Sequence, residues 1–152
     1  MRRKPKIYLD TSVISALFDE RNPERKTLTE EFFLKIEDYD VYISEITIAE
    51  IEKTPDLTLR QKMMKTINGF KLLEIITDVE TLADEYIHYG AVPESYAEDA
   101  YHIAIAVIYE MDFLLSWNFR HIVRRKTKDI VRMVNTLKEL KQIEIITPGE
   151  LL

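Results

Sequence analysis

Short β-like runs alternate along this chain with longer segments of helical periodicity, and no other feature constrains its fold as strongly. Between the short runs, apolar residues recur every three or four positions, as they do at Leu28, Phe32 and Ile36. Strands that alternate with helices form parallel sheets with helices on both faces, so the pattern predicts an α/β fold. The runs expected to form strands are Lys6–Leu9, Val41–Ile43, Leu72–Thr77, Asp112–Ser116 and Ile143–Thr147.

The chain shows no internal boundary that would divide it into domains. Its 152 residues, of which 46% are hydrophobic, suit one domain with one core. It has only three glycines and five prolines, and it contains no linker, repeat or low-complexity tract. We therefore expect a single domain over residues 1–152.

Composition also limits the location and the chemistry. Cysteine is absent, which excludes disulfides, thiolate zinc sites and a cysteine nucleophile and is typical of a reducing compartment. The longest apolar run, Ile103–Tyr109, is far shorter than the ~20 residues that span a bilayer, and no signal-type stretch follows the N-terminus. We expect a cytoplasmic protein without membrane contact. The net charge of −6 argues against a protein that coats nucleic acid, but not against an enzyme that binds a short stretch of it.

Sites in open α/β sheets gather at the carboxyl ends of the strands, which draws attention first to Asp10. Asp10 directly follows the first run, and Thr11 or Ser12 can cap a helix that begins near Val13. Aspartate is common at such turns, so the spacing alone fits a capping residue as well as a site residue.

Glu50 is the second candidate. Ser44 ends the second run and can cap a helix on which Glu50 shares a face with Ile46. A carboxylate on a mostly apolar face needs a partner or a cation. Glu50 could equally be a solvated surface residue, as Glu45 and Glu52 are expected to be.

Asp99 is the third candidate. Ser95 and Glu98 have the spacing of a capping box, and the helix that they would open is almost uncharged until Glu110. Since capping occupies Glu98 in this interpretation, Asp99 is the preferred site residue near the start of a buried helix. His102 lies on the same side, where a hydrogen-bonded core histidine is favoured over a metal ligand.

Ser116 and Asn118 complete the set at the end of the fourth run, although Asn118 could simply support a turn. Three acids and an amide at one sheet edge would repel each other without a cation. Oxygen ligands of this kind select Mg²⁺ or Mn²⁺ over zinc. A hard cation on carboxylates activates water and neutralises phosphate charge, which is the usual apparatus for phosphodiester cleavage.

These residues lie in four segments, spread over nearly the whole chain, in which the sequence resembles the PIN-domain ribonucleases, a family that includes the VapC-type toxins. The segments are Tyr8–Ile14, Ser44–Ile51, Glu98–Ala106 and Leu115–Ile122. The resemblance implies a three-layer α/β/α fold with a central parallel sheet of about five strands. It also implies that Asp10, Glu50 and Asp99 bind the metal and that Ser116 and Asn118 occupy the last polar positions. Many members have aspartate where this chain has Asn118, and the lost charge should weaken a second metal position.

The resulting hypothesis is a metal-dependent endoribonuclease. The three acids would hold Mg²⁺ or Mn²⁺, a water would attack an RNA phosphodiester, and Thr11, Ser116 and Asn118 would orient waters or the phosphate. A basic stretch follows the site and would hold flanking phosphates, although a solvated helix end explains it equally well. Its residues are Arg120, Arg124, Arg125 and Lys126. The resemblance further suggests a protein antitoxin as partner and a homodimer.

Three alternatives stay open. The Asn118 substitution is compatible with a catalytically weak or inactive PIN-like module that binds RNA or a partner protein. A phosphatase of the haloacid dehalogenase type needs a second aspartate two residues after Asp10, where this chain has Ser12. A receiver domain needs an acidic pair at the end of the first strand, where only Asp10 is present. The last two rank low.

Overall fold

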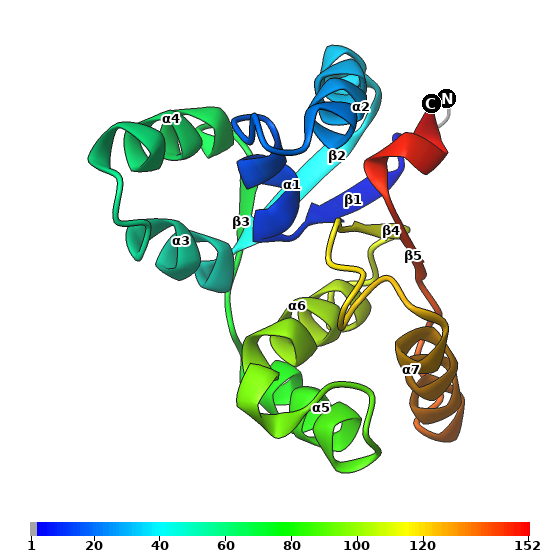
Figure 1. Ribbon diagram of the computed structural model, residues 1–152. Coiled ribbons are helices and arrows are strands. Elements are labelled where there is room, and N and C mark those ends of the chain that lie inside the picture. Colours follow the sequence, from blue (N-terminus) through cyan, green and yellow to red (C-terminus); the bar gives the residue numbers. More distant parts are fainter. Residues whose placement is uncertain (1–2) are drawn as a thin grey trace.

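The computed structural model describes residues 3–152 and shows a central sheet of five parallel strands with helices on both faces (Figure 1). The strand order β3-β2-β1-β4-β5 places the first strand in the middle, between β2 and β4. The predicted fold class is therefore confirmed. The strands are β1 (Lys6–Leu9), β2 (Asp40–Ser44), β3 (Lys71–Leu73), β4 (Phe113–Leu115) and β5 (Glu144–Ile146).

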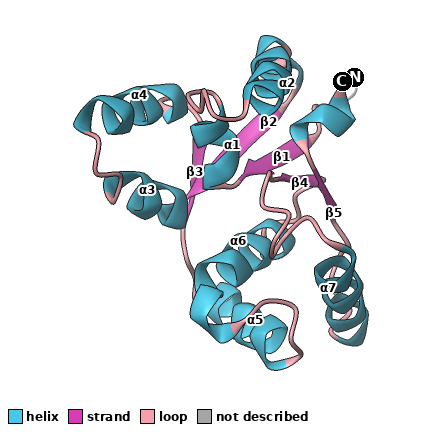
Figure 2. Ribbon diagram, in the orientation of Figure 1, coloured by secondary structure: helices cyan, strands magenta, loops and turns pink. Residues whose placement is uncertain are grey.

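The helices form the two outer layers (Figures 1 and 2). One layer contains α1 (Thr11–Ala16), α2 (Pro23–Leu34), α3 (Glu45–Glu52) and α4 (Leu57–Ile67). The other contains α5 (Thr77–His88), α6 (Ala97–Ile108) and α7 (Arg125–Leu137). Short 3₁₀ helices are η1 (Ile36–Asp38), η2 (Glu94–Tyr96) and η3 (Pro148–Leu151). Among residues 3–152, no helix has the length and apolar character needed to cross a membrane.

Strand β1 shows why the sheet divides the core in two. Successive side chains of a strand point to opposite faces, and β1 is apolar at consecutive positions because both faces are covered. Ile7 and Leu9 pack in one core with Phe32 of α2, whereas Tyr8 packs in the other with Ile103 of α6. All five of these residues are at most 1% exposed.

Four of the five predicted strands match the observed bounds to within one residue at each end, but the third was too long. It was predicted over Leu72–Thr77, whereas β3 ends at Leu73 and Thr77 already begins α5. The reason is the register, since Leu73 pairs with Ser44, the last residue of β2. Because β3 is an edge strand, no other strand is available to extend it.

Asp112 ties the start of β4 to the start of β1, and its substitution tests this link. Its carboxylate accepts from the main-chain N–H of Lys6 at 2.8 Å and pairs with Arg3. Burial alone would raise the pKa of Asp112, but these donors lower it overall. Its stabilising contribution is therefore present above the ordinary aspartate pKa and is lost as the pH falls through the lowered value.

We expect Asp112→Asn to lower the free energy of unfolding at neutral pH by about 1 kcal/mol and to flatten its fall in acid. Urea denaturation at several pH values measures both effects. The exposed Asp78→Asn is the matched control. Equal acid sensitivity in the wild type and Asp112→Asn would contradict the assignment.

Candidate active site

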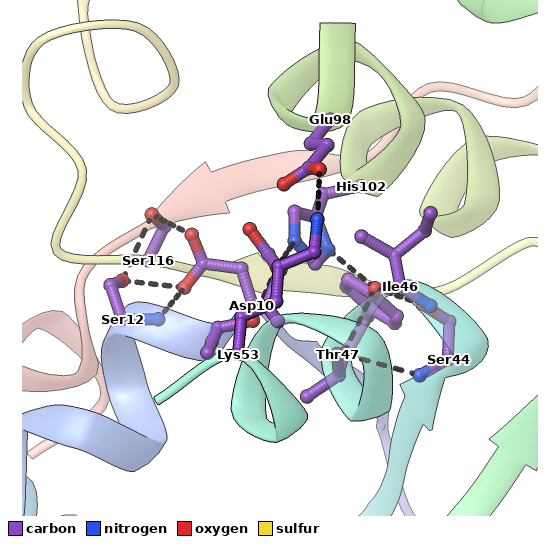
Figure 3. Close-up of polar contacts among 12 residues, drawn as sticks. Asp10, Ser12, Ser44, Ile46, Thr47, Lys53, Glu98, His102 and Ser116 are labelled. Carbon is purple, nitrogen blue, oxygen red and sulfur yellow. Dashed lines mark hydrogen bonds and ion pairs between the residues drawn. The ribbon is translucent and has the colours of Figure 1, made fainter. Parts of the chain in front are cut away.

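The carboxyl ends of the three central strands bring the polar candidates together. Leu9 pairs with Leu115 in the register, so Asp10 lies beside Ser116. Ser44 ends β2 on the other side of β1. Figure 3 shows Asp10 between the hydroxyls of Ser12 and Ser116, with His102 of α6 nearby.

Asp10 is the N-cap of α1 and one of the most buried carboxylates of the site. It is 3% exposed, and its oxygens accept from Ser12 N at 3.1 Å, Ser12 Oγ at 2.5 Å and Ser116 Oγ at 2.7 Å. The expectation that Thr11 or Ser12 caps the helix is wrong, because Asp10 is still extended and Thr11 is already helical.

Within the part of the chain that the structure describes, the carboxylate of Asp10 has no lysine or arginine partner. Within residues 3–152, its hydrogen-bond donors are the main-chain N–H of Ser12 and two serine hydroxyls. Burial raises the pKa of Asp10, and nearby His102 and the two hydroxyls counteract this only in part. A carboxylate in this position is both a helix cap and a group that a bound cation would stabilise.

Glu50 is held in place by two donors and is not a solvated surface residue. Its Oε1 accepts from Thr11 Oγ1 at 2.5 Å and from His102 Nε2 at 2.6 Å. Burial alone would raise the pKa of Glu50, but the hydrogen bond and charge of His102, together with the Thr11 hydroxyl, lower it to about 2. The carboxylate is therefore ionised at neutral pH. Thr11, predicted to orient water or phosphate, here orients Glu50.

His102 is a hydrogen-bonded core histidine, as predicted. It is 1% exposed, and its Nδ1 lies 2.6 Å from the Tyr8 hydroxyl, which in turn lies 2.7 Å from Ser44 Oγ. Burial alone would lower the pKa of His102, but Tyr8 and Glu50 raise it well above its usual value. A protonated ring donates to both partners and so fixes the position of Glu50.

Tyr8 is a site residue that the sequence analysis missed. Its hydroxyl connects the His102 ring to Ser44. Ser44 in turn caps α3 by accepting from Ile46 N at 3.2 Å (Figure 3). The only signal in the sequence was a tyrosine, whose side chain ends in a polar hydroxyl, between aliphatic residues of a strand that is expected to be buried. Such a hydroxyl needs a partner in the core.

Asp99 lies near the start of α6, but not for the predicted reason. The capping box of Ser95 and Glu98 is wrong, because Ser95 lies in η2 and α6 begins at Ala97 without a side-chain cap. The η2 turn provides the start of the helix instead. Glu98 pairs with Lys53 at 3.4 Å, so capping gives no reason to prefer Asp99 over it. Asp99 belongs to the site through its own contact, Oδ2 to His121 Nδ1 at 3.0 Å.

A cavity of about 410 Å³ joins the acids of α3 and α6. Its lining comprises Glu50, Ser95, Tyr96, Ala97, Glu98 and Asp99. Carboxylate oxygens are the donors that Mg²⁺ and Mn²⁺ prefer, so the residue types fit such a metal. Glu50 and Asp99 are each hydrogen-bonded to a histidine, however, and no three acidic or histidine side chains of residues 3–152 are gathered closely enough to form a metal centre.

The loop after β4 supports the acids. Ser116 is fully buried, donates to Asp10 and accepts from Asn118 N at 2.9 Å. The amide oxygen of Asn118 accepts from His121 N at 2.9 Å, which places this oxygen in the turn rather than toward a ligand. His121 was not predicted, since a histidine next to an arginine in a loop gave no sign of its contact with Asp99.

The predicted RNA-binding residues divide into different environments. Arg124 is half-buried and donates to Thr127 Oγ1 and to the carbonyl oxygen of Ala91, so its guanidinium supports the fold. Arg125 and Lys126 are exposed at the start of α7. Arg120 is exposed beside the cavity, with its guanidinium carbon 5.4 Å from the centre of the Tyr96 ring.

Comparison with protein families identifies the fold. The PIN domain model matches residues 7–125, a span that contains Asp10, Glu50 and Asp99. The chain belongs to the PIN domain family. The resemblance seen in the sequence is therefore confirmed. No curated protein matches the sequence of this PIN domain.

Two solved structures share the fold of this PIN domain. Mycobacterium tuberculosis VapC20, described as a toxin that cleaves the sarcin-ricin loop, matches with a TM-score of 0.60 and 14% identity, over 76% of this chain and 92% of its own. VapBC2 from Rickettsia felis, solved on a DNA fragment from its promoter, matches with a TM-score of 0.57 and 13% identity, over 92% of this chain and 96% of the other. At these identities the likeness is one of fold.

We expect Tyr8→Phe to lower the free energy of unfolding by about 1–3 kcal/mol, because it leaves a buried nitrogen of His102 without a partner. Urea denaturation at neutral pH measures the change. Tyr42→Phe on the neighbouring strand is the matched control, since its ring is only half-buried. Equal losses in the two variants would show that the Tyr8 hydroxyl has no special role.

Proposed function

We propose that this PIN domain, spanning residues 1–152, is a metal-dependent endoribonuclease that hydrolyses RNA phosphodiester bonds in the cytoplasm. The observation that carries the proposal is Asp10, a buried carboxylate at the carboxyl edge of the sheet that has no lysine or arginine partner among residues 3–152. Glu50 and Asp99 approach the same edge from α3 and α6 and line one cavity. An acid in such a position is stabilised by a cation and is otherwise costly.

Asp10, Glu50 and Asp99 are the residues that would hold Mg²⁺ or Mn²⁺. When bound, such an ion activates a water and neutralises charge on the phosphate. The chain itself keeps the three acids in position. Hydroxyls of Ser12 and Ser116 orient Asp10, while Thr11 and His102 orient Glu50.

The histidines act on the acids and not on the phosphate. His102 holds Glu50 ionised through a 2.6 Å hydrogen bond, and His121 contacts Asp99 at 3.0 Å. Ser116 adds a hydroxyl next to Asp10, and Arg120 places a positive charge at the rim of the cavity. A negatively charged RNA strand would be drawn to Arg120, and more weakly to Arg125 and Lys126, which are farther along the chain. Arg124 contributes by holding the start of α7 against the carbonyl oxygen of Ala91.

A toxin role extends this proposal. The two structural matches are a toxin named as cleaving the sarcin-ricin loop and a VapBC2 assembly on its promoter DNA. A protein antitoxin is the partner that this likeness suggests, and a homodimer is compatible with it. The second candidate function is an inactive module that binds RNA or a protein, favoured by Asn118 and by the absence of a gathered metal centre among residues 3–152.

Cleavage of a mixed pool of single-stranded and structured RNAs tests the nuclease. We expect cutting with Mg²⁺ or Mn²⁺, none with chelator, and a loss of at least about 100-fold in Asp10→Asn and Asp99→Asn. Asp78→Asn, an exposed acid on α5, is the control. Cleavage that persists in Asp10→Asn would overturn the site, and no cleavage with either metal would favour the binding module.

Thermal unfolding tests metal binding without any substrate. Mg²⁺ should raise the melting temperature of the wild type, because an ion that binds only the folded state stabilises it, by about 2.7 kcal/mol at 100 times its Kd. Asp10→Asn should lose this response, because it removes one of the carboxylates that would hold the ion. An equal Mg²⁺ response in both proteins would show that the ion binds elsewhere.

A further inference from the structure

The loop from Trp117 to His121 crosses the acid site and sends side chains to both helix layers. It is tied down at its start, where Trp117 N donates to Ser12 Oγ at 2.8 Å. Phe119 then meets Arg25 of α2, whereas the next residue, Arg120, meets Tyr96 beside α6. Helices α2 and α6 cover opposite faces of the sheet (Figure 1). The loop therefore contributes to one aromatic–arginine pair on the α2 side of the sheet and to another on the α6 side.

The first pair borders the cavity that contains Glu50 and Asp99. The Tyr96 ring is 42% exposed and lines this cavity. Its centre lies 4.2 Å from that of the His121 ring, and the Arg120 guanidinium carbon lies 5.4 Å from it. The Tyr96 ring is therefore held between the tilted His121 ring and the Arg120 guanidinium, and both Tyr96 and Arg120 are exposed.

The second pair is built in the same way on the α2 side. The Phe119 ring is 47% exposed, and the Arg25 guanidinium carbon lies 5.2 Å from its centre and 5.7 Å from that of Trp117. Trp117 is 8% exposed and donates from Nε1 to Thr29 Oγ1 at 2.9 Å, so it is fixed. Phe119 is edge-on to it, with ring centres 6.2 Å apart.

Aromatic rings and guanidinium planes are the surfaces on which unpaired nucleobases stack. The net charge of −6 gives this protein little general electrostatic attraction for RNA, so base stacking is the interaction that would contribute most to RNA binding. A base in a duplex is already stacked on its neighbours and offers no free face. The two pairs therefore fit a single strand and exclude a helix.

We propose that Tyr96 with Arg120, and Phe119 with Arg25, are two nucleobase-binding subsites for an unpaired RNA strand. The proposal rests on the proposed function, because it places the phosphate to be cut at the acids between the subsites. The two bases that flank that phosphate are turned outward, one onto each pair.

Binding without cleavage tests the subsites. Fluorescence anisotropy in chelator and low salt compares a labelled single-stranded oligoribonucleotide with the same strand in a duplex. We expect the single strand to bind more tightly to the wild type, and Tyr96→Ala and Phe119→Ala each to weaken it by about fivefold to 100-fold. Tyr89→Ala, which removes a ring that is 45% exposed at the end of α5, is the control and should bind as the wild type does.

A second readout separates stacking from charge. An oligonucleotide with 2-aminopurine in place of one base reports stacking by quenching, which should be lost in Tyr96→Ala or Phe119→Ala. Arg120→Lys keeps the positive charge but removes the planar guanidinium group. We therefore expect this variant to retain the salt dependence of RNA binding but to bind RNA more weakly. Unchanged affinity in Tyr96→Ala and Phe119→Ala, or no binding by the wild type, overturns the proposal.

The outcomes distinguish this proposal from the proposed function. If the wild type cleaves RNA, and Tyr96→Ala and Phe119→Ala bind and cleave RNA as the wild type does, the proposed nuclease function is supported and the proposed subsites are overturned. If the wild type binds single strands through these rings but cleaves no RNA with either metal, the proposed subsites are supported and the proposed nuclease function is overturned. If the rings are needed only for binding a protein partner, RNA affinity is unchanged and the subsites fall as well.

Discussion

A buried chain of hydrogen bonds holds the centre of this PIN domain together. It runs from Glu50 on α3 through His102 on α6 to Tyr8 on β1 and ends at Ser44 on β2. In an apolar interior each of these groups would be costly if any link were missing, so the chain forms only when both helix layers are docked on the sheet. The acid site is thereby coupled to the packing of the whole domain.

This coupling explains how one small site can be both polar and rigid. Asp10 uses its two oxygens to hold the start of α1 and the hydroxyl of Ser116, and Glu50 uses one oxygen for Thr11 and His102. The surrounding core leaves these side chains little freedom. Preorganised groups of this kind need no rearrangement when a charged ligand arrives.

The architecture was largely predictable from the sequence, because periodicity reports directly which faces are buried. The positions of Asp10 and Ser116 followed from the rule that parallel strands end at one edge. What remained out of reach depended on tertiary register. The end of β3 is set by Ser44 on a neighbouring strand, and the start of α6 by the η2 turn and not by the spacing of Ser95 and Glu98. The partners of Asp99 and His102, which are His121 and Tyr8, are 22 and 94 residues away in the sequence, and nothing near Asp99 or His102 in the sequence indicates which residues they contact.

The order of the strands has a consequence for synthesis. Asp10 is translated 106 residues before its partner Ser116, because β4, and not a strand closer in the sequence, is the neighbour of β1 on this side of the sheet. A partly translated chain therefore holds the first acid with no pocket around it. Whatever this edge of the sheet does, it requires that the polypeptide be synthesised at least as far as β4, so no fragment that ends before this strand can do it.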